Sequence, residues 1–212
     1  MYSLFPNING ALTNITISNA DTKSEYIARF QPMYQFVNID EDINFYNKVN
    51  KTQILINSYY FLNENIMSSS VQSIVGDNWY VEDATWESTI AHEFGHYISF
   101  VILLKKNNLN NITYVTKDNY NVIDNVITEF NSGSYSNILL SEALNNYNNI
   151  YGTNLSLYDF AISISMYAAS LDSNGNLIAD ETIAEAIHDY YLHGNNMKSQ
   201  SRAIIDVIYS KL

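Results

Sequence analysis

The chain has 212 residues and no cysteine. Disulfide bonds and thiolate metal sites are therefore excluded, and any metal ligand must be a His, Asp or Glu side chain. Basic residues are also scarce: ten Lys and Arg stand against 22 Asp and Glu, and the formal net charge is −12. Without a broad basic surface, neither nucleic acid nor an anionic membrane is an expected partner.

Long apolar runs are missing as well. No run reaches the ~20 residues that a membrane-spanning helix needs, and residues 1–7 lack the basic start and apolar core of a signal peptide. We therefore expect a protein that is cytoplasmic in the cell that makes it. Hydrophobic residues make up 47% of the chain, enough for a folded core, and the length suits one domain over residues 1–212.

The sequence does contain the pattern H-E-x-x-H, at His92, Glu93 and His96, inside a stretch that is typical of a helix. Two histidines four residues apart share one helix face, so their rings could hold one zinc ion. Glu93 could then take a proton from a water on that ion. The His and Glu frequencies of this chain give roughly 0.004 expected accidental matches. The alternative is a pair of surface histidines on an ordinary amphipathic helix.

The residues around this pattern favour a helix that is backed by a core. We predict it over 86–106, capped by Asp83 or Thr85. Gly95 costs about 1 kcal/mol relative to Ala inside a helix, which predicts a close approach of another backbone or of the metal shell. Apolar residues recur at helical spacing away from the two histidines, namely Trp86, Ile90, Phe94, Tyr97, Ile98 and Val101.

The rest of the chain predicts an α+β fold, with a small twisted sheet over this helix and a helical C-terminal part. The sheet belongs to residues 1–80, the active-site helix to 81–106 and the helical part to 107–212. Strands are predicted at 12–18 and 53–60, where apolar and β-branched residues dominate. The second strand is either an edge along which a peptide lies or a plain internal strand.

Helices are predicted wherever apolar residues recur at helical spacing. These segments are 63–74, 122–130, 139–151, 157–168 and 179–191, together with a short helix that carries Tyr26, Ile27 and Phe30 and is capped by Asp21 or Ser24. Residues 31–50 show no clear pattern, and 75–82 is expected to be a loop. Residues 172–176 predict a turn and not a calcium loop, because a Glu at the twelfth position is missing.

A catalytic zinc ion needs a third protein ligand, and the helix predicted over 179–191 offers two. Glu181 and Glu185 are four residues apart and share a face. Two stacked carboxylates repel each other unless a positive charge lies beside them. One could bind zinc, and the other could accept a hydrogen bond from a ligand histidine and fix its tautomer. The residue types alone allow either order.

These motifs resemble the gluzincin branch of the zincin metallopeptidases. The chain is similar to the catalytic domain of anthrax lethal factor and its bacterial relatives, and to the metallopeptidase domain of phage minor head proteins. The resemblance covers roughly residues 50–212. It is carried by Ser-Thr-Ile-Ala-His-Glu-Phe-Gly-His (88–96), Ile-Ser-Met-Tyr-Ala (164–168), Glu-Thr-Ile-Ala-Glu-Ala-Ile (181–187) and Tyr-Leu-His-Gly-Asn-Asn-Met-Lys-Ser-Gln-Ser (191–201). Metzincins fit less well, because no third His follows His96 at their short spacing.

The resemblance implies a zincin-like fold and a zinc-dependent endopeptidase that acts on a polypeptide substrate. It implies Glu181 as the third zinc ligand and Glu185 as the carboxylate that supports a ligand histidine. It further implies that Tyr167 donates its hydroxyl to the developing oxyanion. Residues 172–177 depart from the spacing of the family between this Tyr and the Glu ligand. The other candidate substrate or oxyanion groups are Tyr190, His188 and His193.

Two further functions are compatible with the resemblance. The chain could be a phage virion or head-associated protein whose zinc site is structural or acts only in assembly, with other virion proteins as partners. It could also be a toxin-like protease effector that is delivered into another cell.

Overall fold

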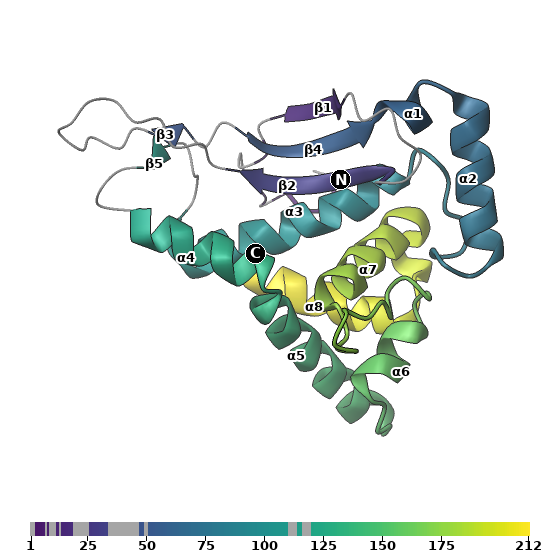
Figure 1. The fold of residues 1–212 in the computed structure, drawn as a ribbon. Helices are drawn as coiled ribbons and strands as arrows, with labels where there is room; N and C mark the ends of the chain where they lie inside the picture. Colours follow the sequence, from purple (N-terminus) through teal and green to yellow (C-terminus); the bar gives the residue numbers. More distant parts are fainter. Residues whose placement is uncertain are drawn as a thin grey trace.

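A three-stranded mixed sheet lies over a layered set of helices (Figure 1). Its strands are β1 (Asn14–Ser18), β2 (Ala28–Met33) and β4 (Lys51–Asn57). β4 is central, with β1 parallel to it on one side and β2 antiparallel on the other. A separate two-stranded ribbon joins β3 (Asn47–Lys48) to β5 (Tyr114–Val115). This computed structural model describes residues 3–6, 8, 12, 14–18, 26–33, 47–48, 51–109, 114–115 and 120–212.

Helices make up most of the described chain, so the fold is α+β as the sequence predicts. They are α1 (Ser58–Phe61), α2 (Glu64–Gly76), α3 (Thr89–Lys106), α4 (Tyr120–Asn131), α5 (Ser134–Tyr151), α6 (Leu157–Ile162), α7 (Ala179–His193) and α8 (Ser199–Lys211), with a short 3-10 turn at Gly194–Asn196. α3 runs beneath the sheet, and α7 lies against the side of α3 that faces away from the sheet (Figure 1). None of these helices has the length and apolar character that crossing a bilayer requires.

The middle helix, α3, is buried on nearly all sides. Phe94, Tyr97 and Ile98 belong to the main core, and so does the run 100–104, in which every side chain is buried. A helix that is apolar all round is stable only when other elements surround it. On the sheet side, the Phe30 ring of β2 lies 6.0 Å from the ring of Tyr97. This packing fixes the distance between the sheet edge and the helix that carries the histidines.

The short helix predicted around Tyr26, Ile27 and Phe30 is wrong. Ala28–Met33 forms β2, in which Phe30 lies opposite Ile54 of β4. Sheet pairing and burial of the aromatic ring outweigh a local pattern that is weak in either conformation. The two predicted caps, Asp21 and Ser24, lie outside the described residues, and the stretch 31–50 is described only at 31–33 and 47–48.

The strand predicted at 53–60 is confirmed as Lys51–Asn57, but its role as a sheet edge is wrong. β4 lies between β1 and β2, so the alternative of an internal strand is correct. The strand ends at Asn57 because its side chain accepts the backbone N–H of Tyr59 at 3.0 Å and caps α1. Within the described sheet, β2 is the edge strand that lies over α3.

Most predicted helices are present, with shifts at their ends. α3 begins at Thr89 and not at 86, because Thr85 and Ser88 exchange hydrogen bonds that hold the preceding residues in a turn. α5 begins at Ser134, five residues before the prediction. α6 ends at Ile162 and not at 168, since the following backbone bonds to a distant loop. The predicted turn at 172–176 is confirmed, with Gly175 at a φ of 80°.

Candidate metal centre

The site is built where α3 and α7 cross at very short range. A Cβ atom added to Gly95 would lie 2.5 Å from the Cα atom of Ala184 on α7. Only a glycine permits this approach, so the close contact with another backbone that the sequence predicts at Gly95 is confirmed. It brings the histidine face of α3 against the acidic face of α7.

Three side chains from these helices converge on one point. Nε2 of His92 lies 3.1 Å from Oε2 of Glu181, and Nε2 of His96 lies 3.6 Å from the same oxygen. Each of these ligand atoms is within 4.8 Å of the others. Zinc–ligand bonds of 2.0–2.1 Å in a tetrahedron put neighbouring ligand atoms about 3.4 Å apart. The observed distances are close to that value, so the three residues are placed to hold one metal ion.

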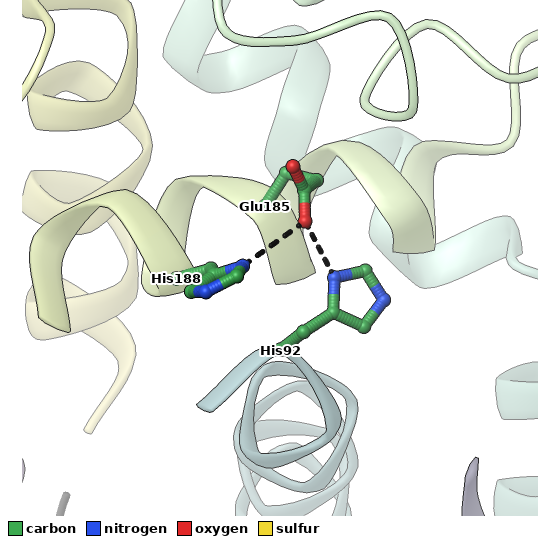
Figure 2. Close-up of side chains that lie close together, drawn as sticks. All are labelled: His92, Glu185 and His188. Carbon is green, nitrogen blue, oxygen red and sulfur yellow. Dashed lines mark hydrogen bonds and ion pairs between the residues drawn. The ribbon is translucent and has the colours of Figure 1, made fainter. Parts of the chain in front are cut away.

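Glu185 contacts the opposite nitrogen of the first histidine. Its Oε1 atom lies 2.8 Å from Nδ1 of His92, as Figure 2 shows. A carboxylate can only accept here, so His92 donates from Nδ1, and its Nε2 becomes a metal ligand once any proton shared with Glu181 is displaced. The two carboxylates thus lie on opposite sides of the His92 ring: Glu181 contacts Nε2 of both histidines, and Glu185 contacts Nδ1 of His92.

The converging side chains open onto a cavity of about 360 Å³. Glu93, His96, Tyr167 and Glu181 line it from the helical side, and β2 lines it from the sheet side. Its volume is at the lower end of the range for sites that take small ligands or side chains. Glu93 is 7% exposed, and its Oε2 atom accepts the backbone N–H of Phe30 at 2.6 Å.

Tyr167 lies over the histidine face. Its ring stacks on the ring of His92, with centroids 5.1 Å apart and planes 19° from parallel. Its backbone N–H donates to the carbonyl of Trp79 at 2.8 Å, which holds the segment in place. Burial, with a further contribution from Glu181, raises the pKa of Tyr167 well above its usual value. The hydroxyl therefore keeps its proton at neutral pH and can act as a donor.

The carboxylates and imidazoles shift one another's pKa in opposite directions. Burial alone would lower the pKa of His92, but hydrogen bonds to Glu181 and Glu185 outweigh it and raise that pKa well above 6.5. Burial would raise the pKa of Glu181, yet the charge of His96 and the His92 bond lower it. The pKa of Glu185 falls to about 2, because bonds from His188 and His92 exceed the cost of its burial. The cluster thus favours bound positive charge.

Two of the candidate substrate or oxyanion groups lie away from this cavity. The hydroxyl of Tyr190 is 3.1 Å from that of Tyr209. Nδ1 of His193 is 2.6 Å from Asp189, in a cluster at the C-terminal end of α7. His188 is fully buried beside Glu185 and does not line the cavity. Among the candidate substrate or oxyanion groups, Tyr167 is therefore the one that lines the cavity beside His96 and Glu181.

Some groups at the site were not expected from the sequence. Tyr80 places its ring 6.1 Å from the ring of His92 and 5.6 Å from that of Tyr167. Ser165 donates to Glu185 at 2.8 Å. Tyr80 lies in the segment that is expected to be a loop, and Ser165 lies in a stretch predicted as helix that the structure places beyond the end of α6. The backbone N–H of Phe30 was missed because the strand that carries it was predicted as helix.

Comparison with protein-family models, with characterised proteins and with solved structures finds no match for this chain. The description of the site therefore rests on its own residues and geometry.

Proposed function

We propose that the chain is a zinc-dependent endopeptidase of the gluzincin type, with a zincin-like fold. The observation that carries this proposal is the convergence of His92, His96 and Glu181 beside the carboxylate of Glu93. The metal would be held by Nε2 of each histidine and by Oε2 of Glu181. When bound, zinc lowers the pKa of a coordinated water towards about 7 and polarises a carbonyl oxygen.

The residues around the metal position can move the protons that peptide hydrolysis requires. Glu93 accepts a proton as water attacks the peptide carbonyl and passes it to the nitrogen of the leaving amine, which breaks the C–N bond. The N–H of Phe30 holds one oxygen of Glu93 and so limits rotation of the carboxylate. Tyr167, with its raised pKa, donates a hydrogen bond to the oxyanion of the tetrahedral intermediate.

The sheet edge supplies a place for the substrate backbone. β2 is one of the two edge strands of the described sheet, and its residues Ala28 and Phe30 line the same cavity as Glu93. An extended peptide can add to such an edge through main-chain hydrogen bonds. The sequence left β4 open as an edge or an internal strand, and in the proposal the edge role belongs to β2. A peptide bound along such an edge can be cleaved within its chain, because neither of its ends has to be recognised.

Glu93→Gln tests the proposal, with Glu87→Gln as the matched control because Glu87 is exposed just before the same helix. We expect the wild type and both variants to bind zinc in metal analysis. Cleavage of a proteome-derived peptide mixture, mapped by mass spectrometry, should fall about 10²–10⁴-fold in Glu93→Gln and persist in Glu87→Gln. Wild-type protein that binds zinc but cleaves nothing would favour an architectural zinc site in a virion. Wild-type protein without zinc would overturn the metal centre itself.

A further inference from the structure

A chain of buried polar groups leads from the metal position into the core. Oε1 of Glu185 lies 2.8 Å from Nδ1 of His92 and 3.3 Å from Nδ1 of His188 (Figure 2). Nε2 of His188 is in turn 2.7 Å from Oγ of Ser88. All four side chains are at most 2% exposed. A buried polar group persists only where it is hydrogen-bonded, so this chain requires an explanation.

The other oxygen of the same carboxylate is fully engaged. Oε2 of Glu185 accepts the backbone N–H of Val81 at 3.1 Å and the hydroxyl of Ser165 at 2.8 Å. A carboxylate offers about four acceptor sites, and these two donors with the two histidines occupy four. His92, Glu185 and His188 are close enough to hold a metal ion. Because their hydrogen bonds already satisfy the carboxylate, the group is better explained as a support than as a second metal site.

The chain of hydrogen-bonded groups starts on α3 and ends at the residue just before α3. Ser88 directly precedes α3, and His92 lies one helical turn further along the chain. Glu185 and His188 are three residues apart on one face of α7. The polar chain therefore runs from α3 to α7 (Figure 2) and, through Ser88, back to the residue that precedes α3. Val81 and Ser165 hold Oε2, whereas His188 shares Oε1 with His92, so His188 acts on the atom that orients the ring.

We propose that His188 is a positioning residue for the metal centre, which acts through Glu185 on the ring of His92. Anchored by Ser88, it fixes Oε1 of Glu185 so that His92 keeps its proton on Nδ1 and presents Nε2 to the metal. The inference rests on the proposed zinc site but not on peptidase activity. Outer groups that orient ligand histidines commonly change metal affinity 10–100-fold when they are lost.

A pair of amide variants separates the two contacts of His188. In His188→Asn the amide nitrogen is close to the former Nδ1 position, so the donor to Glu185 is kept and the contact with Ser88 is lost. In His188→Gln the amide reaches the former Nε2 position, which keeps Ser88 and loses Glu185. We expect the zinc Kd, from competition with a chelator, to stay within about 3-fold of wild type in His188→Asn and to rise roughly 10-fold in His188→Gln.

A spectroscopic measurement reports the ring directly. In the zinc-loaded protein, long-range proton–nitrogen spectra show which nitrogen of His92 carries the proton, and the chain has four histidines to resolve. We expect the Nδ1 proton to exchange slowly in wild type and His188→Asn and faster in His188→Gln. Thermal unfolding of the metal-free variants, each lacking one buried bond, checks that a general loss of stability does not explain the difference.

The outcomes distinguish this inference from the proposed function. Equal zinc affinity in the two variants, or weaker binding by His188→Asn, would overturn the positioning role alone. Zinc binding with the expected order but without peptide cleavage would support the role and overturn the peptidase. Wild-type protein that does not bind zinc would overturn both.

Discussion

Glu181 and Glu185 are chemically identical, lie one turn apart on α7 and contact opposite nitrogens of His92. They differ in how deeply their side chains are buried. The Glu181 side chain is 20% exposed at the cavity, whereas that of Glu185 is 0% exposed. A carboxylate at the cavity wall can exchange its partners for a metal ion, but one with four buried donors cannot do so without leaving them unsatisfied. Burial therefore favours Glu181 as the ligand and Glu185 as the support in the proposed metal site.

The same substitution at both positions tests this assignment. Glu181→Gln removes an anionic ligand, so we expect most zinc affinity to be lost. Glu185→Gln keeps an acceptor for His92 but weakens it, and we expect a loss of about 10–100-fold. Chelator competition measures both. A larger loss in Glu185→Gln than in Glu181→Gln would reverse the roles of the two carboxylates.

The raised pKa of His92 predicts how zinc binding depends on pH. Because hydrogen bonds to Glu181 and Glu185 raise the pKa of His92, the metal-free protein holds a proton there to higher pH than an ordinary histidine does, and zinc must displace that proton. Calorimetry in buffers of different ionisation enthalpy should therefore show proton release, which declines as the pH rises through the pKa of folded His92. In the metal-free protein, the raised pKa of His92 contributes stability to the fold. This contribution is fully present below pH ~6.5 and is lost as the pH rises through the pKa of the folded protein. Zinc binding at pH 7 without proton release would contradict this.

At the scale of elements, the crossing of α3 and α7 depends on one missing side chain. Gly95→Ala would press a methyl group into the backbone of Ala184, at a cost of about 1–3 kcal/mol or more. That cost exceeds the ~1 kcal/mol that Ala gains over Gly inside a helix. We expect a lower midpoint of thermal unfolding and weaker zinc binding, because the two ligand-bearing helices must separate.

Gly76→Ala is the matched control. Gly76 ends α2, and a Cβ atom there would meet nothing within 4 Å. We expect its midpoint to be unchanged or slightly higher, since Ala restricts the unfolded chain. If Gly95→Ala is as stable as wild type, the short approach of the two helices is not a requirement of the fold.

Elements that depend on neighbouring residues could be predicted from the sequence, whereas elements that depend on distant partners could not. α2, the turn at 172–176 and the acidic face of α7 depend on neighbouring residues, and they are present as predicted. β2 and the end of α6 depend on distant partners. Phe30 is in a strand because β4 pairs with it, and α6 stops because residues 166 and 167 donate to the carbonyls of 78 and 79. No pattern in the neighbouring sequence indicates those partners.

The site shows the same division. The histidine pair and its Glu follow from a short motif on one helix, which any reader of the sequence can find. The pairing of Glu181 with the histidines spans 89 residues and was reached by resemblance. The sequence also offers His188 as a candidate cavity group, whereas it lies buried behind Glu185, a placement that depends on how α7 packs against α3.

For the whole molecule, the metal position joins parts that lie far apart in the chain. Glu93 is tied to β2, the histidines belong to α3, and Glu181 begins α7. His92, His96 and Glu181 are close together only in the folded protein, so a metal ion held by them would bind the native state far better than the unfolded chain. The free energy of binding is then added to the free energy of unfolding.

Zinc should therefore raise the midpoint of thermal unfolding. At a free concentration 100-fold above Kd the stabilisation is about 2.7 kcal/mol, which corresponds to roughly 5–10 °C for a chain of this size. Differential scanning calorimetry with and without zinc measures the shift. Glu93→Gln keeps all three ligands and should show the full shift, whereas His96→Ala lacks one and should show little. A shift that survives in His96→Ala would mean that zinc binds elsewhere, since the stabilisation must come from the residues that hold the ion.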